Sequence, residues 1–185
     1  MRRERDCVAT ELHLFAVPGI PEISFAADLA RIIVDAVAHA GLTLQAGDVL
    51  VIAQKIVSKA EGATVSLADV APSPLASEWA TTHGLDAAVV EVVLRESRRI
   101  VRMDRGLIIA ETRHGYVCAN AGVDASNVPA GYVTLLPRDP DASAARLLTA
   151  LGTWVDGPGG ESGPLDQART VQGDELRHTF RLGSH

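Results

Sequence analysis

The sequence predicts one α/β domain, in which a mixed sheet packs against three or four helices, followed by a poorly ordered carboxyl-terminal tail. The chain has 185 residues, 47% of them hydrophobic, which is enough to bury a sizeable core. Short apolar runs alternate with longer segments in which apolar residues recur every three or four positions. After residue 151 this pattern stops, and 7 of the 16 glycines follow. We therefore expect a domain over residues 1–151 and a tail over 152–185.

Strands are expected where short apolar runs are bounded by turn residues. They cover residues 12–17, 49–53, 63–67, 99–119 and 132–136, with turns inside the fourth range at 104–106 and 112–115. The run at 49–53 is apolar at every position, so we expect other parts of the protein to cover both its faces.

Helices are expected where apolar residues share one face and capping residues mark the ends. They cover Phe25–Ala40 after an N-cap at Ser24, Pro74–His83, the residues from a cap at Asp86 to Glu96, and Ala142–Leu151. Before the last of these helices, Asp139 and Asp141 resemble a carboxylate pair. A turn that leads into a helix cap explains them well, so we interpret them as structural.

Composition excludes several classes of function. The net charge of −6 argues against a nucleic-acid-binding protein, which normally shows a basic face. No apolar run is long enough to span a bilayer, and the charged amino terminus leads into no signal core, so we expect a cytoplasmic protein. The two cysteines show no metal-ligand spacing and make no disulfide framework.

The lysines are the first candidates for a functional site. Of 17 cationic residues 15 are arginine, and the only two lysines are Lys55 and Lys59, four positions apart directly after the apolar run at 49–53. Lysine binds phosphate as a compact point charge, and the carboxyl ends of strands in α/β sheets are common ligand sites. The alternative is that two exposed lysines fell together by chance.

A polar loop is the second candidate. Asp124, Ser126 and Asn127 follow a short buried strand and stand among small residues that let a ligand approach closely. The alternative is an Asx-turn, in which Asp124 or Asn127 bonds only its own backbone. No common catalytic motif is present. From spacing alone, the lysine segment and this loop support a metal-assisted, phosphate-handling site.

Six ordered blocks of the sequence carry a family resemblance. They are Val17–Pro21, Gly47–Val51, Ile56–Gly62, Val92–Ser97, His114–Pro129 and Leu136–Ala144. Together they make the chain, from about residue 14 to residue 151, resemble the coenzyme F420-0:L-glutamate ligase family, where F420 names a deazaflavin cofactor. The resemblance implies a ligase that uses GTP and Mn²⁺ or Mg²⁺ to add L-glutamate to F420-0 through a γ-glutamyl linkage, by way of an acyl phosphate. It also implies a homodimer.

The resemblance assigns roles to residues that match the family's motifs. Ile20, Pro21, Glu22 and Ile23 match a nucleotide-binding turn, and Gln54, Lys55 and Lys59 match a nucleotide-binding strand end. Asp124 matches a metal-binding carboxylate and Asn127 a nucleotide contact. Among these residues we expect Lys59 and Asp124 to act in catalysis, because phosphoryl transfer needs positive charge on the transferred group.

The chain departs from the family pattern after the helix that ends near Leu151. Family members resume there with an apolar strand and an Asp-Thr pair that completes the metal site, and residues 152–185 resemble none of it. Two hypotheses follow. Either the tail or a second chain supplies the missing ligands to an active ligase, or the chain is a non-catalytic nucleotide-binding or regulatory module. A third possibility is an unrelated α/β fold.

Overall fold

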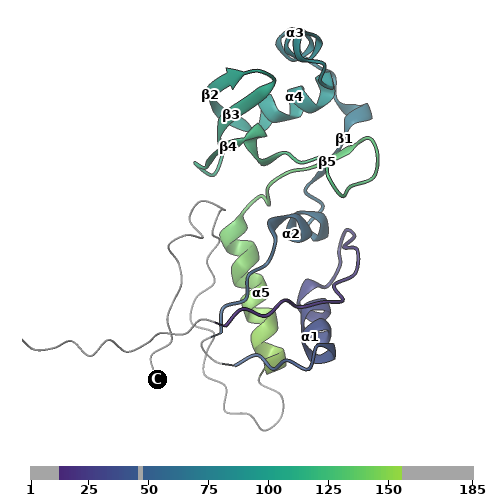
Figure 1. Ribbon diagram of the computed structural model, residues 1–185, viewed down its shortest axis with the longest axis vertical. Coiled ribbons are helices and arrows are strands. Elements are labelled where there is room, and N and C mark those ends of the chain that lie inside the picture. The colour runs from purple at the N-terminus through teal and green to yellow at the C-terminus, as the bar shows by residue number, and fades with distance from the viewer. Residues whose placement is uncertain (1–12, 46–47, 156–185) are drawn as a thin grey trace, which may run out of the picture.

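The computed structural model describes residues 13–45 and 48–155, which form two lobes (Figure 1). The helical lobe consists of residues 13–45, 48–60 and 137–155, with helices α1 (Leu29–His39), α2 (Gln54–Ala60) and α5 (Pro140–Val155). The sheet lobe consists of residues 64–134. It contains β1 (Thr64–Ser66), β2 (Ser97–Asp104), β3 (Leu107–Thr112), β4 (Val117–Ala119), β5 (Tyr132–Thr134), α3 (Pro74–His83), α4 (Ala87–Glu96) and the 3-10 turns η1 (Leu67–Asp69) and η2 (Asn120–Gly122). None of the helices in these described ranges is both long and apolar enough to cross a bilayer.

The strands form two antiparallel sheets. β1 pairs with β5, with Val65 opposite Val133, and β2, β3 and β4 form a second sheet in that order. The predicted α/β class is therefore confirmed. The strands do not form the single mixed sheet that we expected, and the described residues contain five α-helices rather than three or four.

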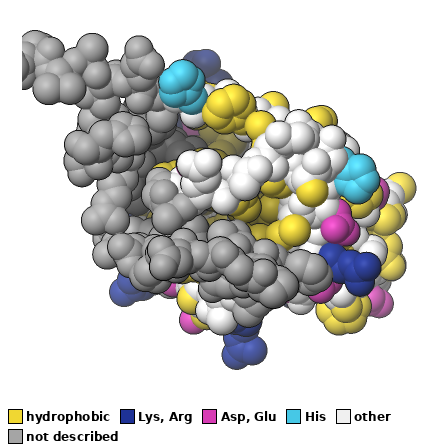
Figure 2. All heavy atoms as spheres, turned by 90° about the horizontal axis from the view of Figure 1, so that it is seen from below, with side chains coloured by type: hydrophobic (Ala, Val, Ile, Leu, Met, Phe, Trp, Pro, Cys, Tyr) yellow, Lys and Arg dark blue, Asp and Glu magenta, His cyan; other side chains and the backbone are white. Residues whose placement is uncertain are grey.

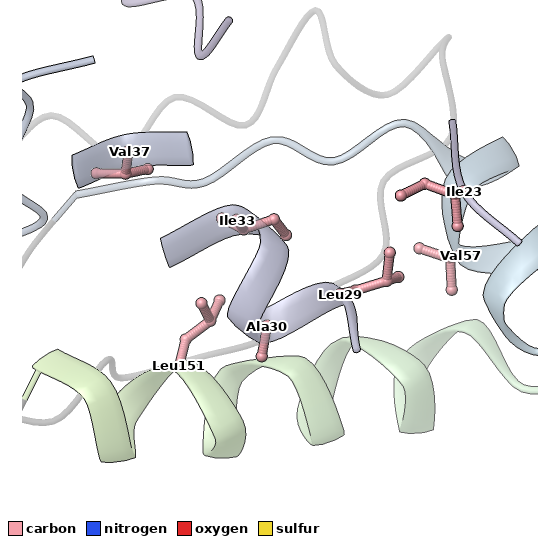
Figure 3. Packing of buried hydrophobic residues seen from close by; sticks show 7 residues of the cluster. All are labelled: Ile23, Leu29, Ala30, Ile33, Val37, Val57 and Leu151. Atoms are coloured by element: carbon pink, nitrogen blue, oxygen red, sulfur yellow. The ribbon is translucent and has the colours of Figure 1, made fainter. Parts of the chain in front are cut away.

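The core of the helical lobe lies between α1, α2 and α5 (Figure 3). Its buried side chains come from the loop before α1 (Ile23), from α1 itself (Leu29 and Ile33 among others), from α2 (Val57) and from α5 (Leu151). Full burial of one such aliphatic side chain contributes about 1.5–3 kcal/mol. This core therefore joins segments that are far apart in the sequence.

Helix α1 begins later than the sequence predicts. Its N-cap is Asp28, whose side chain accepts a hydrogen bond from the N–H of Arg31 at 3.1 Å, and not Ser24. The backbone of Ala26 has φ of 61°, which is incompatible with a right-handed helix, and its N–H donates to the carbonyl of Ala60 at 2.9 Å. Residues 24–27 therefore form a turn that binds to the end of α2.

The predicted strands at 12–17 and 49–53 are wrong where they can be compared with the structure. Residue 12 lies outside the described residues, while residues 13–17 and 49–53 form no strand and pair with no strand among the described residues. The lysine segment that follows is not the end of a strand, because residues 54–60 form α2. An apolar run alone does not make a strand, since the ladder needs a partner backbone.

The core of the sheet lobe lies between α3, α4 and β3. Val93 of α4 and Ile108 of β3 are both 2% exposed, and Ala76 of α3 packs in the same cluster. The predicted turn at 104–106 joins β2 and β3, and its residues Arg105 and Gly106 both have positive φ. The other predicted turn, at 112–115, joins β3 and β4.

Helices α3 and α4 begin at the expected caps. The hydroxyl of Ser73 accepts from the N–H of Ala76, and the carboxylate of Asp86 accepts from the N–H of Ala88 at 2.7 Å. The mostly buried carboxylate of Glu91 on α4 holds the two helices together. It accepts the N–H of Ser73 at 2.9 Å and the guanidinium Nε of Arg95 at 2.8 Å.

Helix α5 leads from the sheet lobe back to the helical lobe and packs against α1. Asp139 caps its start as predicted, because its carboxylate accepts the N–H of Ala142 at 2.9 Å. The helix runs to Val155, four positions beyond the end that we expected at Leu151. Residues 156–185, which make up most of the predicted tail, lie outside the described residues.

Candidate nucleotide site

Lys55 of α2 contacts the polar loop of the sheet lobe. Its Nζ lies 2.6 Å from Oδ2 of Asp124, and it donates to the hydroxyl and, at 3.2 Å, to the carbonyl of Ser126. The two candidate segments that the sequence places far apart therefore meet directly. The Lys55 side chain is 22% exposed and that of Asp124 is 41% exposed, so the pair lies at the surface with the carboxylate accessible to a ligand.

The loop around Asp124 is rigidly anchored. Its backbone exchanges two hydrogen bonds with Thr134 of β5, at 3.0 and 2.8 Å, which adds an isolated bridge to the edge of the β1–β5 sheet. Oδ1 of Asp124 accepts the N–H of Ser126 at 2.6 Å, which is an Asx-turn. The Asx-turn of the alternative is therefore present, but Asp124 does not bond only its own backbone, because its other carboxylate oxygen binds Lys55.

The environment of Asp124 favours the ionised carboxylate. Partial burial raises the pKa of Asp124, but the hydrogen bonds from Lys55 and Ser126 outweigh this effect and hold the pKa below its usual value. The carboxylate therefore stays charged in mildly acidic solution, as an oxygen ligand for a cation must.

Lys59 contacts the turn before α1. It forms an ion pair with Glu22, and its side chain is only 10% exposed while that of Glu22 is 80% exposed. Both lysines are thus mostly covered and paired with carboxylates, so they are not the exposed lysines that the alternative assumes. Since Lys55 and Lys59 are one helical turn apart on α2, they point to the same side of the helix.

The other residues of the predicted nucleotide-binding turn differ in what they can contribute. Ile23 is buried in the core of the helical lobe, and Ile20 is partly buried against the same core. Their side chains hold the turn in place, so they can offer a nucleotide only backbone groups. Pro21 and Glu22 are exposed at the surface beside Lys59.

Gln54 fixes the start of α2 to the chain that follows β5. Its Nε2 donates to the carbonyl of Leu135 at 3.0 Å and to the hydroxyl of Ser58, which is fully buried. Asn127 has φ of 55° and is exposed, and its side chain makes no hydrogen bond to another described residue. It is therefore accessible to a ligand that binds beside the Asp124 loop.

Lys55, Lys59, Asp124 and Glu22 form the charged cluster of the candidate site. Its two positive and two negative charges balance without a ligand. The two ammonium groups of α2 face the carboxylates of Glu22 and Asp124. A phosphate group that bound both lysines would have to replace these carboxylates as their partner. The released Asp124 would then be available to a cation that accompanies the phosphate.

The described residues supply little of a metal site on their own. Within residues 13–45 and 48–155 no three His, Cys, Asp or Glu side chains lie close enough together to hold a metal ion. A single carboxylate fits Mg²⁺ or Mn²⁺ only when phosphate oxygens and water complete the coordination, which is a common arrangement for nucleotide-bound Mg²⁺. Asp124 is suited to this role.

Sequence reasoning missed α2 and the residues that fix it. The pair Gln54 and Ser58 has the four-residue spacing of neighbours on a helix, and this spacing could have indicated α2. Thr134 anchors the Asp124 loop through its backbone, and no sequence pattern could have indicated this. The contact depends on how β5 lies against the loop.

The fold and the cluster define an α/β protein with a candidate phosphate-handling site at the junction of two lobes. A family model described as F420-0:Gamma-glutamyl ligase matches residues 19–156. The match covers both lobes and every residue of the cluster, and the chain therefore belongs to the F420-0:γ-glutamyl ligase family.

Curated relatives agree with this family. The coenzyme F420:L-glutamate ligase of Methanothermobacter thermautotrophicus is 47% identical over 140 residues, which are 76% of this chain and 56% of the relative. The protein of the same name from Methanopyrus kandleri is 52% identical over 128 residues, which are 69% of this chain and 49% of the relative. The chain thus spans about half the length of these curated relatives.

Proposed function

We propose that this chain forms part of a ligase that adds L-glutamate to coenzyme F420-0 through a γ-glutamyl linkage, with GTP as the phosphoryl donor. One observation carries the proposal. In a chain of this family, Lys55 and Lys59 on one side of α2 each bind a carboxylate from a different loop, Asp124 and Glu22. In a GTP-dependent ligase, the two lysines would bind phosphate and Asp124 would bind a metal ion.

The proposed reaction has two steps. A carboxylate oxygen of F420-0 attacks the γ-phosphorus of GTP, which forms an acyl phosphate and releases GDP. The amino group of L-glutamate then attacks the carbonyl carbon of the acyl phosphate, inorganic phosphate leaves, and the nitrogen loses a proton as the amide forms. Activation of the carboxylate is needed because a free carboxylate is a poor electrophile toward an amine.

The residues of α2 act on the phosphate groups. Lys59 and Lys55 exchange their carboxylate partners for phosphate oxygens, and their charge stabilises the phosphoryl group during transfer. Gln54 holds α2 against the chain after β5, so the lysines keep their positions. This preorganisation matters because a displaced phosphate costs orders of magnitude in rate.

Asp124 is the proposed protein ligand of a divalent cation, Mn²⁺ or Mg²⁺, which would be held together with phosphate oxygens. Such an ion supplies further neutralisation of phosphate charge. The backbone of Ile20, Pro21, Glu22 and Ile23, with the side chain of Asn127, is the proposed contact for the rest of the nucleotide. We further propose a homodimer, as the family resemblance implies, which sedimentation of the purified chain checks.

A second function is favoured by the composition of the site. Because the described residues contain no group of three His, Cys, Asp or Glu side chains that could hold a metal ion, a non-catalytic nucleotide-binding or regulatory module is the alternative. This module would keep affinity for GTP without turnover.

The deciding experiment incubates the purified chain with F420-0, GTP, L-glutamate and Mn²⁺ and measures the products by mass spectrometry. The ligase is supported by a product heavier by one glutamate residue that is absent without GTP and absent in Lys59→Ala and Asp124→Ala. The Methanothermobacter relative serves as the positive control. Binding of GTP by calorimetry, with no product under conditions in which the relative is active, would favour the non-catalytic module.

A further inference from the structure

Phe25 is an exposed aromatic residue whose ring has a defined position. It lies in the turn before α1, and the residue is 75% exposed to solvent. The ring lies against Gly62, because a Cβ at Gly62 would be 2.8 Å from both Cδ2 and Cε2 of Phe25. Gly62 has a positive φ of 71° and no side chain, so its backbone leaves room for the ring on this side.

The backbone on both sides of Phe25 is fixed. Ile23 is buried in the same cluster as Val57 of α2 (Figure 3). The residue after Phe25, Ala26, has a left-handed φ of 61°, and its N–H donates to the carbonyl of Ala60 at 2.9 Å. Strained backbone of this kind persists only where the surrounding structure enforces it, and such positions cluster at ligand-binding sites. The turn therefore holds Phe25 at the end of α2 at a cost in stability.

Exposure alone would not mark Phe25 as functional. Hydrophobic side chains reach the surface at several places on the face shown in Figure 2, and single exposed apolar residues are normal in globular proteins. Phe15 is an example, since it is 68% exposed and stacks with His13, with 6.4 Å between the ring centroids. Phe25 differs, because its ring stacks with no aromatic side chain among the described residues.

The position of the ring relative to Lys59 indicates a ligand. The N–H of Gly62, against which the ring lies, donates to the carbonyl of Lys59 at 3.1 Å. Glu22, which precedes Phe25 by three residues, is the ion-pair partner of Lys59. A phosphate group on Lys59 and a group that contacts Phe25 would therefore belong to neighbouring parts of one ligand. Nucleotides join phosphate groups to a planar ring within one such molecule.

A planar heteroaromatic ring suits an exposed phenylalanine that has one face free. Aromatic rings attract each other in offset-stacked arrangements, and every nucleic-acid base has a π-face that can stack in this way. Stacking of one base on an aromatic side chain strengthens binding by about five- to a hundredfold. A phenyl ring offers no hydrogen bond, so it recognises a flat ring in general and not guanine in particular.

We propose that Phe25 is a stacking platform for the planar ring of a substrate whose phosphate binds Lys59. The inference rests on the proposed phosphate-binding role of Lys59, and it adds a side chain outside the nucleotide contacts proposed for residues 20–23 and Asn127. The proposed reaction offers two planar rings, the guanine of GTP and the deazaflavin of F420-0. Stacking suits both, so the experiment has to distinguish them.

The test measures binding to the full chain by calorimetry, with GTP, F420-0 and inorganic triphosphate as three separate ligands, each in the presence of Mg²⁺. Phe25→Ala should weaken the binding of a ring-bearing ligand by about tenfold. It should leave the affinity for inorganic triphosphate unchanged, because triphosphate has no ring. A loss with GTP assigns the platform to guanine, whereas a loss with F420-0 alone assigns it to the deazaflavin.

Two further variants separate stacking from a structural effect. Phe25→Trp should keep the affinity for the ring-bearing ligand, because indole stacks at least as well as phenyl. Its added fluorescence should change when that ligand binds and not when triphosphate binds. Phe15→Ala is the matched control and should leave all three affinities unchanged. Both phenylalanines are largely exposed, so the melting temperature should change little when either is replaced by alanine.

Four outcomes overturn the inference: no binding of either ring-bearing ligand, no loss of affinity in Phe25→Ala, an equal loss with triphosphate, or the same losses in Phe15→Ala. None of these measurements requires turnover. Binding that depends on Phe25 without glutamate addition would support the platform and contradict the proposed ligase. Product formation by a Phe25→Ala variant with unchanged affinities would support the ligase and contradict the platform.

Discussion

The ammonium group of Lys55 lies 2.6 Å from Oδ2 of Asp124, and this ion pair joins α2 of the helical lobe to a loop of the sheet lobe. One helical turn further along α2, Lys59 is paired with Glu22 from the turn before α1. Each lysine therefore already has an anionic partner where a phosphate would bind. A ligand at this site must compete with protein carboxylates for the two lysines.

Replacement of Lys55 by alanine should weaken GTP binding by about ten- to a hundredfold, because a hydrogen bond to a charged group contributes about 1.5–3 kcal/mol. The free energy of unfolding should fall by less than about 1 kcal/mol, since ion pairs near the surface contribute little. Calorimetry measures the first quantity and urea denaturation the second. The control Arg31→Ala removes an exposed ion pair on α1 and should leave GTP binding intact. Equal loss of GTP affinity in both variants would contradict the role of Lys55.

Stability should depend on pH through Glu91. Hydrogen bonds from Ser73 and then from Arg95 lower the pKa of Glu91 from 4.5 to about 2. Because the pKa is lower in the folded than in the unfolded protein, ionised Glu91 adds stability that is fully present above a pH of about 4.5. This contribution is lost as the pH falls toward about 2.

The variant Glu91→Gln isolates this effect. At pH 7 it should reduce the free energy of unfolding by about 1.5–3 kcal/mol, because two partners lose a charged acceptor. Below a pH of about 4.5 its stability should fall less steeply than that of the wild type. Asp35→Asn, at an exposed position on α1, is the control and should keep the wild-type slope. Thermal unfolding between pH 2 and 7 checks this, and parallel curves for wild type and Glu91→Gln would refute it.

Gly122 precedes the Asp124 loop and should not tolerate a side chain. Its φ is 75°, and a Cβ at this position would lie 2.7 Å from Cγ of Leu136. Gly131 has a similar φ of 81° with nothing within 4 Å, so it is a matched control. Gly131→Ala should cost about 1–2 kcal/mol for the left-handed backbone alone. Gly122→Ala should cost about 1–3 kcal/mol more, because Leu136 must move. Denaturant unfolding of both variants measures the difference, which would be absent if the site were open.

Ala26 is a position where glycine should stabilise the protein. Its φ of 61° costs an L-residue about 1–2 kcal/mol. Ala26→Gly removes this cost and adds about 0.4–1 kcal/mol of unfolded-chain entropy, so a net gain of about 0.5–1 kcal/mol is expected. The neighbouring variant Ala27→Gly, at a position without positive φ, should instead destabilise by about 0.4–1 kcal/mol. Melting temperatures that shift in the same direction for both variants would show that the strain at Ala26 is unimportant.

Local features of the fold were predictable from the sequence. The caps at Ser73, Asp86 and Asp139 and the turn around Gly106 all depend on residues within a few positions of one another. The cluster itself was also predicted in outline, since the isolated lysine pair and the loop at Asp124 have unusual composition. The structure brings them into contact.

Features that depend on distant partners were not predictable. The apolar run at 49–53 has a strand-like sequence, but a strand forms only beside another backbone, and none of the described residues provides one. Ser24 is a good cap by type, yet the hydrogen bond from Ala26 to Ala60 draws the chain out of helical geometry. In the same way, the burial of Ile23 depends on α2 and could not be inferred from its neighbours in sequence.

The packing of α5 against α1 also determines the order in which the molecule can fold. Residues 64–134 form the sheet lobe as one continuous segment, whose helices and hairpins contact close neighbours in the chain, so it can fold early. The helical lobe needs Leu151, near the end of the described chain, to complete the core around Ile23 and Leu29. During synthesis we therefore expect the sheet lobe with Asp124 to form first, and α2 to gain its final position against it only after α5 has been synthesised.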